Sequence, residues 1–228
     1  CRRSKTVIVN FQRVKEDVAR HYRVSAARIQ VIPEAPRTSL LNATSDLAAI
    51  RIRYGLDHGF VFYPSITWPH KNHVRLLDAI ALVRTRLGRS VQLVCSGVQY
   101  DPHWPAIEAR VAELSLGDQV RFLGFLPQED LPALYQLAGC LVLPTLFEAN
   151  SLPMFEAWRE GTPVVSSNVT ALPEQAGGAA LLFDPFDTAA MADAIVRVLT
   201  DQALAADLSR HGTARMFVDV SAFQMAEI

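Results

Sequence analysis

Short apolar segments recur along the chain and alternate with stretches whose apolar residues follow helical spacing. Most of these segments are too short for a helix and have no polar face, which is typical of strands buried in a parallel sheet. The pattern predicts eight strands, over residues 6–10, 29–33, 60–65, 91–96, 119–124, 140–145, 162–167 and 179–183.

Helical spacing fills the intervals between several of these strands. One predicted helix ends at Gly88 and presents an apolar face made of Leu76, Ile80, Val83 and Leu87. Two more helices are indicated at the same spacing, by Ile107, Val111 and Leu114 and by Leu131, Leu134 and Ala138. Strands that alternate with helices predict an α/β domain with a doubly wound, Rossmann-like parallel sheet over residues 59–200.

Ligands of such sheets bind beyond the carboxyl ends of the strands. We therefore expect the functional site at the turns that follow Ser65, Ser96, Gly124 and Thr145.

The two ends of the chain differ from this central pattern. Residues 1–36 predict one strand–helix–strand unit, which is too small to form its own core, so we interpret it as the remnant of an amino-terminal domain. Residues 37–58 begin with a stretch rich in proline, serine and asparagine and are predicted to be an interdomain linker. Residues 201–228 predict two short helices, with a stop at 211–213.

Composition narrows the function classes. The chain has 228 residues, half of them apolar, and a net charge of −1, so it lacks the basic surface that nucleic acid requires. No apolar run approaches the roughly 18 residues needed to span a bilayer. Cys1, Cys95 and Cys140 are far apart and form no metal-type pair, as expected for thiols in a reducing compartment. We expect a cytoplasmic protein.

Two glutamates, Glu148 and Glu156, mark the candidate site. The preceding strand ends at Thr145, and Asn150 or Ser151 is a favourable cap for the helix that follows. Glu148 therefore belongs to the loop and Glu156 to the helix. The N–H groups of the first helical turn lie between them and attract anions, especially phosphate. This order of acceptor, donors and acceptor matches a nucleotide sugar.

The segment FEANSLPMFEAWREGTPVV, residues 147–165, resembles the E-x7-E signature of retaining glycosyltransferases of the group 1 type, family 4, which have the GT-B architecture. Similar segments surround it in the family's order: VIPEAP (31–36), YPSITWPHKNHVRLLDAI (63–80), RFLGFLPQEDLPALYQLA (121–138) and ALPEQAGGAALLFDP (171–185). The resemblance covers residues 5 to about 200. It implies that the chain is the carboxy-terminal, donor-binding half of a GT-B fold, preceded by the tail of the amino-terminal domain.

The resemblance implies a role for each candidate residue. Glu148 would hold hydroxyls of the transferring sugar and Lys71 would neutralise the diphosphate, which makes these two the candidate catalytic residues. Glu156 would accept hydrogen bonds from the ribose hydroxyls. The other donor-binding residues would be those of the helix start and of the loop that meets the base: Asn150, Ser151, Leu152, Gly124, Phe125 and Leu126.

The implied reaction moves a hexose from a nucleoside diphosphate sugar to a glycan or lipid-linked acceptor, with retention of configuration and without a metal or other cofactor. The WPHKNH segment favours GDP-mannose as the donor. The acceptor would be bound by the amino-terminal domain. The resemblance also implies polysaccharide assembly at the cell surface and is compatible with peripheral association at the inner face of the membrane.

Two features depart from the family's pattern. The family usually has an arginine five or six positions before the lysine, where this chain has Ile66 and Ser65. The glycines that often follow the first glutamate are replaced by Ala149, Asn150 and Ser151, although asparagine tolerates unusual backbone angles. These departures leave a non-catalytic nucleotide-sugar or partner-binding module as an alternative, and a nucleotide-sugar epimerase as another.

Residues around Lys71 have further interpretations. His70 and His73 flank it, but no third ligand is near in sequence, so we expect no metal site. Arg75, one helical turn later, is a second candidate for contact with the anion. A phosphorylase that uses pyridoxal phosphate is disfavoured because no lysine follows Lys71, and a dinucleotide-dependent oxidoreductase because no G-x-G-x-x-G follows a predicted strand.

Overall fold

The computed structural model describes residues 3–33 and 46–224, without the side chains from 217 onwards. All eight predicted strands form, each within its predicted range. They are β1 (Val7–Val9), β2 (Ile29–Val31), β3 (Val61–Pro64), β4 (Leu93–Ser96), β5 (Val120–Phe122), β6 (Cys140–Leu143), β7 (Val164–Ser167) and β8 (Leu181–Phe183).

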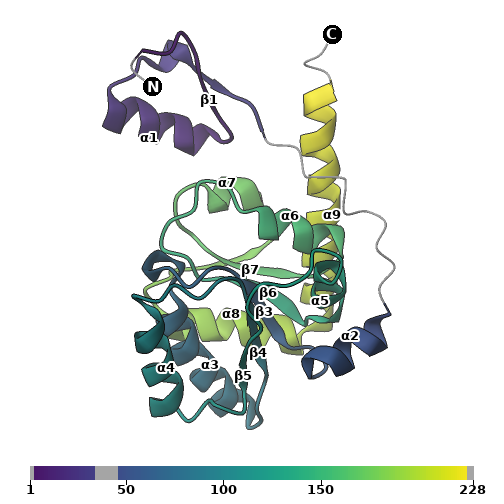
Figure 1. The fold of residues 1–228 in the computed structure, drawn as a ribbon. Coiled ribbons are helices and arrows are strands. Elements are labelled where there is room, and N and C mark those ends of the chain that lie inside the picture. The colour runs from purple at the N-terminus through teal and green to yellow at the C-terminus, as the bar shows by residue number, and fades with distance from the viewer. Residues whose placement is uncertain (1–2, 34–45, 225–228) are drawn as a thin grey trace.

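Six of the strands form one parallel sheet in the order β5-β4-β3-β6-β7-β8 (Figure 1). The chain runs outward from β3 to β5 and then returns to place β6 on the other side of β3. The strand order therefore reverses between β3 and β6. In doubly wound sheets a ligand crevice opens at this point, beyond the carboxyl ends of the two strands.

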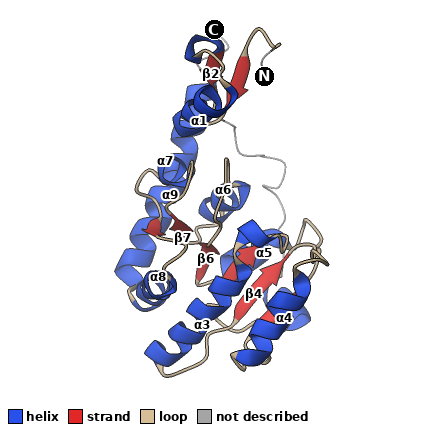
Figure 2. Cartoon of the chain, turned by 90° about the vertical axis from the view of Figure 1, so that its left-hand side faces the viewer, coloured by secondary structure: helices blue, strands red, loops and turns tan. Residues whose placement is uncertain are grey.

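Helices cover both faces of the sheet, as predicted. α3 packs against α4 and α8 in one layer, and α6 packs against α5 and α9 in the other (Figures 1 and 2). Gly88, at a φ of 63°, ends α3 in the left-handed conformation that favours glycine. The helices of this part are α2 (Leu47–Tyr54), α3 (His73–Leu87), α4 (Trp104–Glu113), α5 (Leu131–Leu137), α6 (Leu152–Arg159), α7 (Leu172–Ala176), α8 (Thr188–Thr200) and α9 (Gln202–Gln224).

The sequence predicts a linker over residues 37–58, but the second half of that segment contains helix α2. Asp46 caps the helix by accepting two first-turn N–H groups. Ile50 is buried in the core of the domain, and the Tyr54 hydroxyl donates to the Asp130 carboxylate at 2.5 Å. These contacts attach α2 to the sheet domain. The part of the predicted linker before Asp46 lies outside the described residues.

The predicted pair of short helices near the carboxyl end is instead the single helix α9. The predicted stop contains Gly212, which lies inside this helix. A Cβ atom at Gly212 would lie 2.0 Å from Cδ1 of the buried Trp158. The glycine thus lets α9 approach the core and does not end the helix. Although α9 has 23 residues, no helix of the described part is long and apolar enough to cross a membrane.

The strand–helix–strand unit predicted at the amino end also forms. β1 and β2 pair in parallel, and α1 (Gln12–Tyr22) connects them. The unit lies beside α7 in Figure 1. Its buried core consists of Val9, Val24 and Ile29.

Candidate functional site

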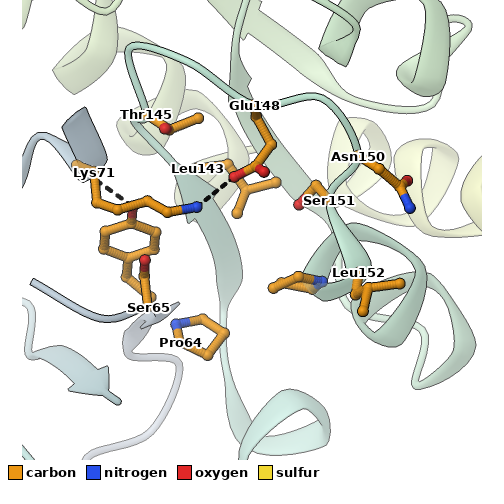
Figure 3. Close-up of a pocket in the computed structure, with 11 residues that line it drawn as sticks. Pro64, Ser65, Lys71, Leu143, Thr145, Glu148, Asn150, Ser151 and Leu152 are labelled. Atoms are coloured by element: carbon orange, nitrogen blue, oxygen red, sulfur yellow. Dashed lines mark hydrogen bonds and ion pairs between the residues drawn. The ribbon is translucent and has the colours of Figure 1, made fainter. Parts of the chain in front are cut away.

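A cavity of about 200 Å³ lies where the strand order reverses, between the ends of β3 and β6 (Figure 3). It brings together five of the nine predicted site residues: Lys71, Glu148, Asn150, Ser151 and Leu152. The other lining residues are Tyr63, Pro64, Ser65, Leu143, Thr145 and Pro153. The predicted turns after β3 and β6 therefore meet in space.

Lys71 and Glu148 form an ion pair across this cavity. The Lys71 ammonium lies 2.5 Å from Oε2 of Glu148, and the side chains are 18% and 21% exposed. Lys71 comes from the turn before α3, and Glu148 from the loop between β6 and α6 (Figure 3). A cation and an acceptor thus point into the same space. A bound anion and a bound hydroxyl would each find one partner there.

The turn that carries Lys71 is held from three sides. Asn72 adopts a left-handed backbone, with a φ of 64°, and its buried amide donates to the carbonyls of Pro144 and Pro185 at 2.9 and 3.0 Å. The Tyr63 hydroxyl donates to the Lys71 carbonyl at 2.9 Å. These bonds fix the turn to the ends of β3, β6 and β8. The Lys71 side chain therefore extends from a backbone that is held in place by hydrogen bonds.

The loop that carries Glu148 is held by the segment before and within α7. Thr170 accepts from the Glu148 N–H at 3.1 Å and donates through its hydroxyl to the Glu148 carbonyl. The Gln175 amide accepts from the Ser151 N–H at 2.9 Å and donates to the Ser151 carbonyl at 2.8 Å. Gln175 and Ser151 are both buried. Both ends of the loop are thereby fixed.

Helix α6 begins at this loop with Ser151 as its N-cap, as predicted, but the Ser151 side chain makes no capping hydrogen bond. The Ser151 N–H is engaged by Gln175, and Pro153 has no N–H. The donors that the first turn offers to an anion are therefore those of Leu152 and Met154. Asn150 does not adopt a positive φ, so its tolerance for left-handed angles is not used here.

A second cavity, of about 590 Å³, adjoins the first because Pro64 and Ser65 line both. Its wall contains the predicted base-contacting residues Phe125, which is 84% exposed, and Leu126, which is buried. The other residues that line it are Ile66, Ser96, Gly97, Gln128 and Leu131. The two cavities together form one groove along the carboxyl ends of β6, β3 and β4.

Two of the predicted residues, Gly124 and Glu156, do not line this groove. Gly124 does not line either cavity, but its carbonyl accepts from the Gly97 N–H at 2.7 Å and so joins the two turns at the groove. Glu156 is half-buried on α6 and also lines neither cavity. Its Oε2 accepts from the Tyr135 hydroxyl at 2.6 Å. Burial raises the pKa of Tyr135, which keeps that hydroxyl a donor.

The neighbours of Lys71 differ from one another. His73 is buried with its ring 4.8 Å from that of Tyr63, and burial lowers its pKa to about 3, so it is a neutral core residue. The Arg75 guanidinium donates to the Asn72 side chain and lies over the ring of Phe186, and Arg75 lines neither cavity. The described residues include no group of three potential metal ligands among His, Cys, Asp and Glu.

Several residues that hold the site were not predicted. Tyr63, Tyr135, Thr170 and Gln175 fix the backbone or the carboxylate of residues many positions away in sequence. Tyr63, Tyr135 and Gln175 lie inside the family-like segments quoted above, but nothing in those segments indicates which residues they contact. Their function follows from contacts that only the tertiary fold creates.

Comparison with known proteins relates most of the chain to one family. Residues 57–201 match the model described as "Glycosyl transferases group 1". The O-antigen chain mannosyltransferase B of Escherichia coli is 38% identical over 146 residues, which are 63% of this chain and 37% of that protein. The serotype-specific mannosyltransferase WbdA of Escherichia coli is 30% identical over 93% of this chain and 27% of that protein. The chain thus spans only part of these relatives.

Solved structures show the same fold. The sucrose-phosphate synthase of Thermosynechococcus elongatus superposes with a TM-score of 0.81 and 29% identity, over 97% of this chain and 57% of that one. Anabaena Alr3699/HepE, in complex with UDP and glucose, has a TM-score of 0.85 and 22% identity, over 99% of this chain and 63% of that one. The second likeness concerns the fold alone.

Proposed function

Because the chain belongs to the group 1 glycosyltransferases, we propose that it is the donor-binding part of a retaining hexosyltransferase. Its donor is a nucleoside diphosphate sugar and its acceptor a glycan or lipid-linked saccharide. The residues before the linker, 1–36, are then the end of an acceptor domain. The observation that carries the proposal is the Lys71–Glu148 pair inside the cavity where the strand order reverses.

The groove fits the parts of such a donor in order. The larger cavity, with the exposed ring of Phe125, suits a base, since an aromatic face offers stacking. The smaller cavity, with Lys71 and the start of α6, suits the diphosphate and the sugar. Glu156, which lies on α6 behind Ser151, takes the ribose hydroxyls in this proposal, and Tyr135 orients its carboxylate.

The same groups supply the chemistry. In transfer with retention, negative charge grows on the departing diphosphate while positive charge grows on the sugar ring. The Lys71 ammonium and the first-turn N–H groups of α6 stabilise the former, and the Glu148 carboxylate holds the sugar through its hydroxyls. This arrangement neutralises the diphosphate without a metal ion, so we expect a chelator to leave transfer unchanged.

We favour GDP-mannose as the donor. The support is that two Escherichia coli relatives are named mannosyltransferases, although UDP is the nucleotide in the Anabaena structure of similar fold. The pathway we propose is polysaccharide assembly on the cytoplasmic side of the membrane. Cys95 and Cys140 are buried free thiols, which suits a reducing compartment.

A non-catalytic nucleotide-sugar-binding module is a second candidate. Ser65 and Ile66 occupy the positions where the family has an arginine, and both line the groove. Among the described residues, Lys71 is the only basic residue that lines either cavity. A site with a single cation can bind a diphosphate. It stabilises the charge that develops on the departing diphosphate less than transfer would require.

Calorimetric titration with UDP, GDP and ADP tests the donor site. We expect saturable binding of one diphosphate, GDP, and a loss of affinity of about tenfold or more, or about 1.4 kcal/mol, in Lys71→Met and in Glu156→Gln. The first variant removes the cation and the second the ribose-binding charge. Lys5→Met and Glu108→Gln are matched controls at exposed positions, and they should bind like the wild type.

Binding that these variants leave unchanged would contradict the proposed site. Transfer is then measured in the complete natural polypeptide that contains this chain, with GDP-mannose, a saccharide acceptor and a chelator. Glu148→Gln should reduce turnover at least a hundredfold. Tight binding without any transfer by the wild type would favour the non-catalytic module.

A further inference from the structure

The amino-terminal unit and the sheet domain are joined by a contact made by one side chain. The two carboxylate oxygens of Glu174, on α7, accept from the N–H groups of Gln12 and Arg13, each at 2.8 Å. These N–H groups open α1, whose N-cap position is Phe11 and provides no capping side chain. The carboxylate thus supplies from another unit the cap that α1 lacks, at the helix end where negative charge is favoured.

The residue next to Glu174 contacts a different part of the molecule. Gln175 is completely buried, and its amide makes a reciprocal pair of hydrogen bonds with the backbone of Ser151 at the start of α6. Two adjacent residues of α7 therefore contact two different elements, α1 and the start of α6. Glu174 holds the amino-terminal unit, and Gln175 holds the wall of the small cavity.

The backbone of this pair is itself fixed by α9. Arg215 donates through Nε to the Gln175 carbonyl at 2.6 Å and through Nη2 to the Glu174 carbonyl at 2.7 Å. Its guanidinium lies against Gly177, where a Cβ atom would come within 2.5 Å of it. The backbone of the pair is therefore attached to α9 by the Arg215 side chain.

The contact at Glu174 also sets the position of α1 relative to Glu148. One face of α1 lines a cavity of about 430 Å³, together with Phe147 and Ala149, the two neighbours of Glu148 in sequence. The residues contributed by α1 are Val14, Asp17, Val18, His21 and Tyr22. A rotation of α1 about its first turn would change the width of this cavity.

We propose that Glu174 is a positioning residue, which holds the amino-terminal unit in a fixed orientation over the donor site. Gln175, beside it, fixes the donor site to the same helix. The role of Glu174 in the reaction rests on the proposed transferase function. We expect that loss of Glu174 impairs the reaction with the acceptor while donor binding persists. Loss of Gln175 should instead weaken donor binding.

The orientation can be measured without any activity. Spin labels are attached to Arg20→Cys on α1 and Glu108→Cys on α4, both exposed, in the 228-residue chain with Cys1→Ser. Cys95 and Cys140 are buried and should not react. Dipolar electron paramagnetic resonance then gives the distribution of distances between the two units.

We expect one narrow distance in the parent chain and a distribution at least twice as broad in Glu174→Gln, because the amide retains at most one of the two hydrogen bonds. Glu16→Gln is the matched control, since it removes an exposed carboxylate from α1 itself and leaves the contact with α7 intact. An unchanged distribution in Glu174→Gln, or an equal broadening in the control, would overturn the proposal.

Steady-state kinetics of the complete natural polypeptide provide the second measurement. In Glu174→Gln, kcat/KM for the acceptor should fall at least tenfold while KM for the donor stays within twofold. Gln175→Leu should raise KM for the donor at least fivefold. An equal loss for both substrates in Glu174→Gln would refute the positioning role. A wild type that transfers nothing would refute the proposed function, and the distance measurement would still decide the role of Glu174.

Discussion

At the scale of single residues, His73 is a neutral histidine inside the core. Neither ring nitrogen has a hydrogen-bond partner in the described part of the chain, and burial, followed by the charges of His103 and Lys71, lowers the pKa of His73 to about 3. The unfolded chain has an ordinary histidine pKa of about 6.5, so it binds the proton more readily below that pH. The contribution of neutral His73 to the free energy of unfolding is therefore fully present above about pH 6.5 and is lost as the pH falls toward 3.

We predict that the free energy of unfolding falls by about 2 kcal/mol between pH 7.5 and pH 5 on account of His73 alone. Urea unfolding of the wild type and of His73→Leu at several pH values measures this difference. The leucine variant keeps an apolar side chain at the site and should lose that part of the pH dependence. Equal slopes in the two proteins would show that His73 does not titrate on unfolding.

At the scale of elements, the packing of α9 depends on a glycine that looks like a helix stop. Replacing glycine by alanine within a helix usually stabilises a protein by up to about 1 kcal/mol. At Gly212 the new Cβ atom would meet the ring of Trp158 at 2.0 Å, which forces α9 away from the core. We predict that Gly212→Ala destabilises the protein by about 1–3 kcal/mol, as overpacking does.

Thermal unfolding followed by circular dichroism measures the change. Gly117→Ala is the control, because no atom would lie within 4 Å of its Cβ and its φ is not positive. That variant should unfold within a few degrees of the wild type. If Gly212→Ala were equally neutral, α9 would not be packed on Trp158 as described.

At the scale of the whole molecule, the two described units differ greatly in how much they bury. The unit of residues 3–33 has four buried apolar side chains, of which only three form a cluster, whereas the sheet domain has a continuous core that includes Phe60, Leu76 and Trp158. A unit of that size rarely folds alone. We predict that residues 46–228 unfold cooperatively and bind the diphosphate, and that residues 1–33 alone show no cooperative transition by circular dichroism. A cooperative transition in the short fragment would contradict this prediction.

The sequence by itself determined the strands of the sheet and the place of the candidate site. Short apolar runs are typical of the strands of a parallel sheet, so all eight strands could be predicted, although β1, β2, β5 and β8 each expose one residue. The order of the strands relative to Lys71, Glu148 and Ser151 placed these residues at strand ends. Local signals were weaker at α2 and α9. Helix α2 has little amphipathic character. Helix α9 contains Gly212, which allows close packing on Trp158 and does not end the helix.

Only the tertiary structure decided which groups meet. The pairing of Lys71 with Glu148 joins residues 77 positions apart, and the contact of Glu174 with α1 joins residues more than 160 apart. Hydrogen bonds and ion pairs act over a few ångströms, so no pattern within one segment of sequence contains them. The same holds for Arg75, whose spacing suggested the anion site but whose guanidinium the fold directs to Asn72 and Phe186.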